Sequence, residues 1–138
     1  MSVNPEPEGS ECGVCGKRAL IITDDPIADV VEGKTYYATG IRYNRCTACG
    51  EEFVWFGQGD EVSRQLFAQA RVDLGRLAGD DIHSVRQSLG LTQAQLEKRL
   101  GVSAGLVGRW ESGTVLQSAM ADRYLRDLMA HPELVDAH

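Results

Sequence analysis

The stretch Leu91–Gly113, LTQAQLEKRLGVSAGLVGRWESG, decides the fold of the C-terminal half of this 138-residue chain. Thr92 suits the N-cap of a short helix, and Gln95 three residues later completes a capping box. Gly101–Ser103 then supplies a helix stop, an apolar side chain and a new N-cap, so a second helix is predicted over Ala104–Ser112. Two helices joined by so tight a turn form a helix-turn-helix, whose second helix enters the DNA major groove. The alternative is an ordinary helical hairpin.

The composition is that of a soluble protein with one ordinary domain or two small ones: 43% hydrophobic and 25% charged residues. No apolar run approaches the ~20 residues that span a membrane. The N-terminus, MSVNPEPEGSE, is acidic and polar, unlike a signal peptide. We therefore expect a cytoplasmic protein without a membrane partner, and a reducing cytosol argues against disulfides between its four cysteines.

The net charge of −6 counts against extensive binding to phosphates, but it is unevenly distributed. Residues 1–59 contain nine acids and five bases, whereas residues 81–138 contain seven acids and six bases. The helix-turn-helix part is thus close to neutral, which allows DNA binding of modest affinity per monomer and favours a dimer.

Two CxxC motifs, each followed by glycine, define the N-terminal half: Cys12-Gly-Val-Cys15 and Cys46-Thr-Ala-Cys49. Two thiolates three positions apart in a turn can face one ion, and two such turns complete a tetrahedron with Zn–S distances near ~2.3 Å. The spacing predicts one structural Zn²⁺ per chain. The alternative is a pair of redox-active or unpaired dithiols, but a catalytic CxxC normally occurs once, at the start of a helix.

The pattern between and around these motifs predicts an α+β protein of two small domains, a zinc-bound β-rich domain and an all-α bundle. Residues 1–11 read as a disordered acidic segment, 12–59 as the zinc domain, 60–79 as a linker helix and 80–138 as the DNA-binding and dimerisation domain. Strands are expected over Leu20–Thr23, Ile27–Val31, Thr35–Arg45 and Glu52–Phe56, with Gly40 as a possible bulge.

The helical pattern starts at about Asp60, and Gly79 is expected to end the linker helix. Asp80 or Asp81 suits the N-cap of the next helix. A final helix is expected over about Gln117–Ala130. It carries an apolar stripe of four residues and two further apolar residues beside it. One apolar face can pack on the core while the remainder meets a second copy in a homodimer; the alternative is that all six residues belong to the core. The stripe is Leu116, Met120, Tyr124 and Leu128, and the further residues are Leu125 and Met129.

The helix-turn-helix sequence resembles the Xre/Cro repressor family, including Arg86 six residues before Thr92 and the ending Trp110-Glu111-Ser112-Gly113. The resemblance implies that Arg86 and Glu111 form a structural ion pair and that Gln93 contacts a phosphate. It places Thr92 at the start of the phosphate-contacting helix and Ala104, Gly105, Leu106, Gly108 and Arg109 along the recognition helix.

Arg109 is the best base reader on that helix, because a guanidinium can bridge O6 and N7 of one guanine. The alternatives for Arg109 are a phosphate contact or a solvated charge. Leu106 either touches a thymine methyl or extends the core. Gly105 and Gly108 within a helix each cost roughly 1 kcal/mol relative to alanine. They either allow close approach of the backbone to DNA or only weaken the helix.

The whole chain, over about residues 12–137, resembles the MqsA-type antitoxins, which have a YgiT-type zinc finger. The resemblance includes the thirty residues between the CxxC motifs, the Gly33-Lys34-Thr35 turn, the Leu91-Thr92-Gln93 start and the closing His131-Pro132-Glu133-Leu134. It implies a zinc domain that neutralises a ribonuclease toxin and a C-terminal domain that dimerises and represses its own operon at a palindrome. The family's base-reading asparagine is replaced here by Gly105.

Three hypotheses follow. The first is an antitoxin-like repressor with a toxin partner, and the second is a stand-alone zinc-ribbon transcription regulator. The third is an enzyme such as a thiol oxidoreductase, which we do not expect because no His, Ser or Asp cluster accompanies the cysteines. A gene for a small basic ribonuclease next to this one favours the first.

Overall fold

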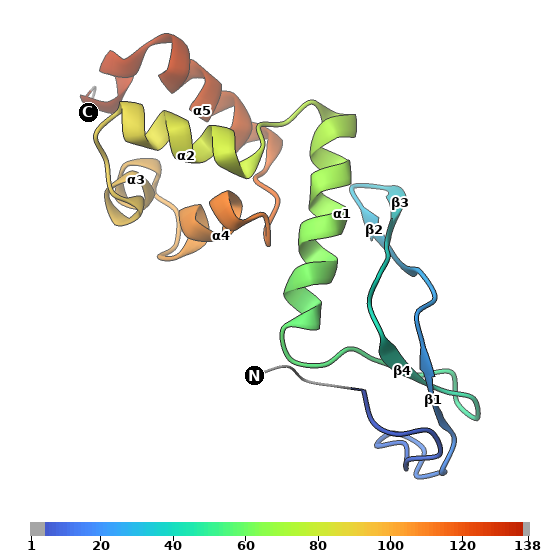
Figure 1. Ribbon diagram of the computed structural model, residues 1–138. Coiled ribbons are helices and arrows are strands. Elements are labelled where there is room, and N and C mark those ends of the chain that lie inside the picture. The colour runs from blue at the N-terminus through green and yellow to red at the C-terminus, as the bar shows by residue number, and fades with distance from the viewer. Residues whose placement is uncertain (1–4, 137–138) are drawn as a thin grey trace. The chain divides into compact units, whose positions relative to one another are not determined.

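The computed structural model describes residues 5–136, and Figure 1 traces the chain. It divides into two compact units, Met1–Leu66 and Phe67–His138. The expected α+β architecture is confirmed, with all strands in the first unit and helices α2–α5 in the second. The boundary falls inside helix α1 (Gln58–Leu74), so residues 58–66 of this helix belong to the first unit and residues 67–74 to the second. Among residues 5–136, no helix is both long and apolar enough to cross a bilayer.

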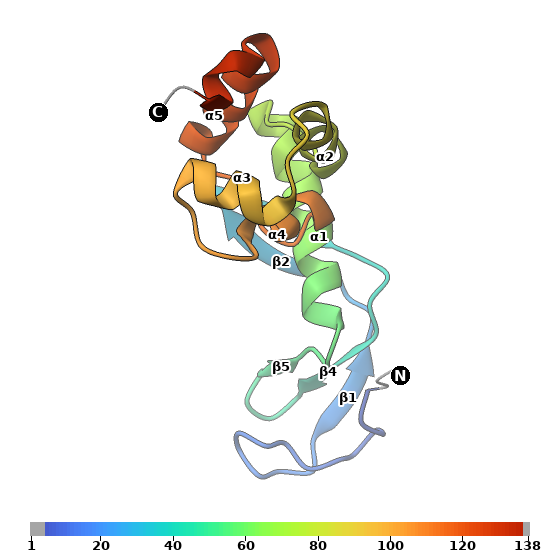
Figure 2. The same ribbon diagram turned by 90° about the vertical axis from the view of Figure 1, so that its left-hand side faces the viewer.

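The first unit contains two antiparallel sheets, whose strands Figures 1 and 2 show. In the three-stranded sheet the order is β1-β4-β5, with Leu20 opposite Cys46; the other sheet is the hairpin β2-β3. The strands are β1 Leu20–Thr23, β2 Ile27–Val31, β3 Lys34–Ala38, β4 Tyr43–Cys46 and β5 Glu52–Phe53.

The prediction of one long strand over Thr35–Arg45 is wrong, because the segment forms two strands, β3 and β4, with an irregular stretch between them. Gly40 adopts φ +77° there, a left-handed conformation that ends the extended run instead of bulging it. The two halves then join different sheets. The strand predicted over Glu52–Phe56 is also shorter, since it ends at Phe53.

Residues 5–11 are ordered along the outer edge of β1, so the prediction of disorder is wrong for them; residues 1–4 lie outside the described part. The Gly9 N–H donates to the Leu20 carbonyl at 2.8 Å, and the Ile22 N–H donates to the Glu8 carboxylate at 3.0 Å. The buried Asn44 side chain accepts from the Glu6 N–H at 2.7 Å and donates to the Glu6 carbonyl at 3.0 Å. The segment thereby supplies partners that the edge of β1 would otherwise lack.

The second unit packs helices α2 (Gly79–Ser88), α3 (Gln93–Leu100), α4 (Leu106–Ser112) and α5 (Ala119–Ala130) around one apolar core. A short 3₁₀ helix, Pro132–Asp136, follows α5. The core is formed by Leu77, Ile82, Leu96, Val107, Trp110, Leu125, Leu128 and Val135.

The boundaries around α2 differ from the prediction. Helix α1 ends at Leu74, before Gly75, which has φ +67°. Gly79 does not end that helix; it begins α2, where an added Cβ would meet the Glu111 carbonyl oxygen at the end of α4. The N-cap is Ala78, whose N–H donates to the Asp81 carboxylate at 3.3 Å, so neither aspartate is the cap itself.

The buried face of α5 also differs from the predicted stripe. Leu125 and Leu128 are buried, whereas Met120 is 83% exposed. Leu125 therefore belongs to the core, and Met120 is one of the residues left over on the surface. The helix begins at Ala119, because the Ser118 hydroxyl caps it by accepting from the Ala121 N–H at 3.1 Å.

Candidate metal centre and DNA-binding motif

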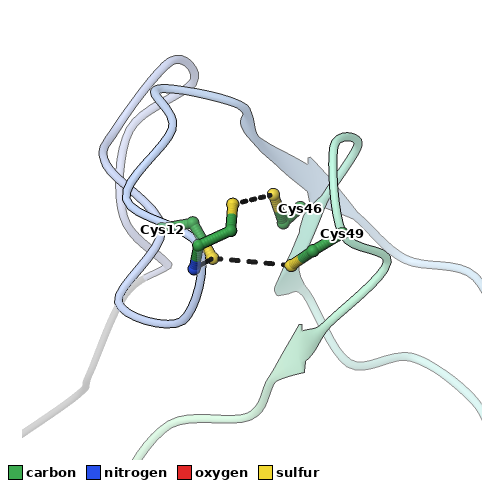
Figure 3. A group of neighbouring side chains, drawn as sticks. Cys12, Cys46 and Cys49 are labelled. Atoms are coloured by element: carbon green, nitrogen blue, oxygen red, sulfur yellow. Dashed lines mark hydrogen bonds between the residues drawn. The ribbon is translucent and has the colours of Figure 1, made fainter.

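The four cysteines come together in the first unit. Figure 3 shows Cys12, Cys46 and Cys49 with their sulfurs turned toward a common centre. All four Sγ atoms lie within 4.8 Å of each other. Cys12 and Cys49 are 3.8 Å apart, and Cys15 and Cys46 are 3.6 Å apart. A tetrahedron with four Zn–S bonds of ~2.3 Å has edges of about 3.8 Å, so these separations fit one tetrahedral ion.

The two CxxC turns have the same backbone geometry, which explains how a short sequence positions each sulfur pair. In the first, the Gly16 N–H donates to the Cys12 carbonyl at 2.8 Å; in the second, the Gly50 N–H donates to the Cys46 carbonyl at 2.8 Å. Both glycines are left-handed, with φ +77° and +78°. Strands β1 and β4 hold the turns together, since Leu20 pairs with Cys46 and the Thr47 N–H donates to the Ala19 carbonyl at 3.0 Å.

The surroundings of the cysteine thiols give them different pKa values. The backbone N–H groups of Cys49 and Ala48 lower the pKa of the Cys46 thiol to about 7. For Cys49, the Glu51 N–H lowers the pKa, but burial and the neighbouring sulfurs raise it to about 12. Four thiols packed so closely cannot all ionise without a positive charge among them. Among the described residues, no histidine or carboxylate joins the cluster, so the four-sulfur donor set is closed.

The helix-turn-helix in the second unit consists of α3, a turn and α4. The Thr92 hydroxyl accepts from the Gln95 N–H at 3.1 Å, and the Thr92 N–H donates to the Gln95 side chain at 2.9 Å. This capping box and the left-handed Gly101 (φ 72°) confirm the predicted start and end of α3. Sequence reasoning missed Glu97, a buried residue whose carboxylate accepts from the Val107 N–H at 3.0 Å and so fixes the first turn of α4.

One carboxylate joins three helices of the motif. Glu111 accepts from Arg86 Nε at 2.7 Å through one oxygen. Its other oxygen lies 3.0 Å from Arg86 Nη2, 2.9 Å from His83 Nδ1 and 3.2 Å from Gln93 Nε2. Burial alone raises the pKa of Glu111, but the hydrogen bonds from Arg86, His83 and Gln93 lower it to about 2. The carboxylate is therefore charged at neutral pH, and no sequence signal points to His83 as part of this group.

The recognition helix starts later than predicted. Helix α4 begins at Leu106, with Gly105 as its N-cap at φ +87°, so Ser103 does not cap it and Ala104 lies in the turn. Gly105 thus imposes no helical cost. Leu106 is half-buried and packs against the core. Gly108 lies within the helix, where a Cβ would come within 3.1 Å of the Gln93 side-chain oxygen. Arg109 is exposed, and within residues 5–136 its side chain forms no hydrogen bond.

One known protein family matches the chain across both units. The family model "Antitoxin component of bacterial toxin-antitoxin system, MqsA" matches residues 10–137. The chain belongs to the MqsA antitoxin family. Among curated proteins, Antitoxin MqsA of Escherichia coli (strain K12) is 27% identical over 127 residues, which cover 91% of this chain and 97% of that protein.

In this MqsA-family antitoxin, the two units carry different kinds of side chains. The first unit offers a closed set of soft sulfur donors that suits a structural ion and leaves no open position for a substrate. The second unit offers exposed polar side chains on a rigid helix pair, Gln93 on α3 and Arg109 on α4. Both side chains are free to offer hydrogen-bond donors to solvent or to a partner.

Proposed function

We propose that this antitoxin represses its own operon by binding a palindromic DNA site as a homodimer, and neutralises a ribonuclease toxin through its first unit. The observation that carries the DNA-binding proposal is the α3–turn–α4 geometry, in which a capped α3 and an αL turn support a helix with exposed Arg109. The proposal gives the protein a binding role in the cytoplasm and no catalytic one.

Arg109 is proposed to read a base and Gln93 to contact a phosphate. Arg109→Ala should cost roughly 1–3 kcal/mol per half-site on the operator and remove its preference over a scrambled duplex. Gln93→Ala should weaken both complexes alike, because phosphate contacts carry no sequence information. The measurement is titration of both duplexes at one salt concentration, with the upstream region of this gene as operator. The control is Arg123→Ala, since Arg123 on α5 is also exposed.

The DNA-binding proposal depends on the difference between the two duplexes. An Arg109→Ala variant that keeps the wild-type ratio of affinities would show that Arg109 does not read the operator. Equal affinity of the wild type for both duplexes would remove the case for a specific repressor.

Cys12, Cys15, Cys46 and Cys49 are proposed to hold one Zn²⁺, which would neutralise their thiolates and join the two CxxC turns. Metal analysis of protein made without added zinc should give one equivalent per chain. Cys46→Ser should lose the ion and the β-structure of the first unit while the helices of the second unit remain. Less than half an equivalent in a folded first unit would contradict the assignment.

The homodimer is proposed to form through the second unit, at a groove of about 350 Å³ beside the start of α5. Leu100, Val102, Met120 and Tyr124 line it, and Met120 is 83% exposed. Burying an exposed methionine against a symmetric copy favours association. Met120→Asp should shift the protein to monomer in light scattering at tens of micromolar. Val72→Asp is the control and should leave the dimer intact, because Val72 on α1 is equally exposed but does not line the groove.

The toxin proposal rests on membership of an antitoxin family. Co-expression with the neighbouring gene should yield a complex that retains the first unit and suppresses RNA cleavage by the partner. Failure to bind any neighbouring gene product would favour a stand-alone regulator.

A further inference from the structure

Gly108 lies inside the short recognition helix α4, where a glycine weakens the helix relative to alanine. Its backbone conformation does not require glycine, since it lacks the positive φ of Gly105 and Gly113 at the two ends of α4. The space beside it is filled by Gln93 of α3. A Cβ at position 108 would lie 3.1 Å from Gln93 Oε1, 3.5 Å from Cδ and 3.6 Å from Nε2. The Gln93 carboxamide therefore takes the place of a side chain at position 108.

Glu111 holds the Gln93 carboxamide in this place. The Gln93 Nε2 donates to Glu111 Oε1 at 3.2 Å, which is the only hydrogen bond of this side chain within residues 5–136. An ionised carboxylate only accepts hydrogen bonds, so the amide nitrogen faces Glu111 and the amide oxygen faces Gly108. Arg86 Nε fixes the same carboxylate from 2.7 Å. A primary amide has two N–H groups, so the exposed Gln93 keeps one of them for a partner.

We propose that Gly108 is a positioning residue for DNA binding: the missing side chain lets the Gln93 carboxamide lie against α4, from where its second N–H donates to a phosphate oxygen. This inference rests on the proposed DNA-binding function. It differs from a close approach of the DNA backbone to Gly108, because the group that fills the space is a side chain of the protein itself.

The geometry predicts opposite effects of an alanine at position 108 on stability and on binding. Gln93 is exposed and at the end of a flexible side chain, so it can swing away from an added methyl group without distorting α4. The helix then gains from the replacement of glycine by alanine. DNA binding loses, because a phosphate donor that is no longer held in place must be ordered again in the complex.

The test uses full-length protein with zinc and two labelled duplexes, the upstream region of the gene and a scrambled version, at one salt concentration. Gly108→Ala should raise the unfolding temperature of the second unit by a few degrees and weaken both complexes about two- to tenfold per half-site. Gly59→Ala is the matched control, because it adds the same methyl group to α1 with no neighbour within 4 Å. It should leave both affinities unchanged.

A double-mutant cycle tests whether Gly108 acts through Gln93. In Gln93→Ala protein, Gly108→Ala should cause no further loss of affinity, because the carboxamide is already absent. Close approach of the DNA backbone to Gly108 predicts the full loss in that background too. If Gly108→Ala melts below the wild type, the cycle still decides, since a folding defect would also lower the affinity of the Gln93→Ala protein.

The contact itself is measurable in the free protein. The Gln93 side-chain amide protons should show nuclear Overhauser effects to the α-protons of Gly108 in the wild type, because the amide nitrogen lies 3.6 Å from the place of a Cβ there. These effects should remain in Gly59→Ala.

Three results would each overturn the inference. The first is a Gly108→Ala protein that binds both duplexes as tightly as the wild type. The second is a loss on Gly108→Ala that persists in full in the Gln93→Ala background, and the third is a wild type without the Overhauser effects. Each removes the role of Gly108 and leaves the repressor proposal intact. A wild type that binds neither duplex overturns both.

Discussion

Replacing Arg71 with methionine should destabilise the second unit by about 2–4 kcal/mol. Arg71 lies on α1 and is only 5% exposed. Its Nη2 donates to the carbonyls of Trp110 at 3.2 Å and Val115 at 2.8 Å, and to the Gln117 side chain at 2.9 Å. Methionine keeps an unbranched apolar chain but leaves these three acceptors without that donor.

The magnitude follows from two opposing contributions. Each buried acceptor left without a donor costs about 1–3 kcal/mol. Part of this cost is offset, because removing the guanidinium also removes a charge that burial disfavours. Desolvation lowers the pKa of Arg71, and the charge of Asp122 partly opposes that shift. The remaining loss corresponds to a fall of about 10–20 °C in the unfolding temperature of a unit of this size.

The assay is heat unfolding followed by Trp110 fluorescence in a Trp55→Phe background with zinc present, because Trp110 lies in the core of the second unit. The matched control is Arg64→Met on the same helix. Its side chain is 44% exposed and forms only a 3.4 Å ion pair with Glu61, so it should cost less than about 0.5 kcal/mol. Equal unfolding temperatures for the Arg71 and Arg64 variants would refute the reasoning.

Three other substitutions test separate contacts. Gly79→Ala should destabilise the second unit by about 1–3 kcal/mol, because its Cβ would meet the Glu111 carbonyl, whereas Gly59→Ala should be neutral or slightly stabilising in the same melt, since nothing lies near its Cβ. The pKa of Glu111 is lowered from its ordinary value of 4.5 to about 2. Its ionised form therefore stabilises the fold at pH values above about 4.5, and this stability is lost as the pH falls toward 2. Glu111→Gln should therefore flatten the pH dependence of urea unfolding in this window, and an unchanged dependence would contradict the assignment. Asn44→Ala should speed hydrogen exchange at the Glu6 amide, which it now holds at 2.7 Å; unchanged protection there would show that Asn44 does not hold the segment.

Features that depend on a few neighbouring residues were predictable from the sequence. The capping box of Thr92 and Gln95 and the left-handed Gly101 are formed by groups at most five positions apart along the chain. Local geometry of this kind is encoded in residue type and spacing. The two CxxC spacings likewise indicated that the cysteines would cluster, because each pair is positioned by its own turn.

Features that depend on partners far along the chain required the tertiary structure. The face of α5 illustrates this: apolar residues lie around much of the helix, and only packing decides that Leu125 is buried and Met120 exposed.

Three polar contacts join residues that are 28 to 46 positions apart: Arg71 with Gln117, Asn44 with Glu6 and His83 with Glu111. The sequence by itself determined the local turns, the pairing of the cysteines in two CxxC turns and the helix-turn-helix. The tertiary structure alone decided which polar groups meet, because a hydrogen bond between distant residues leaves no periodic pattern in the sequence.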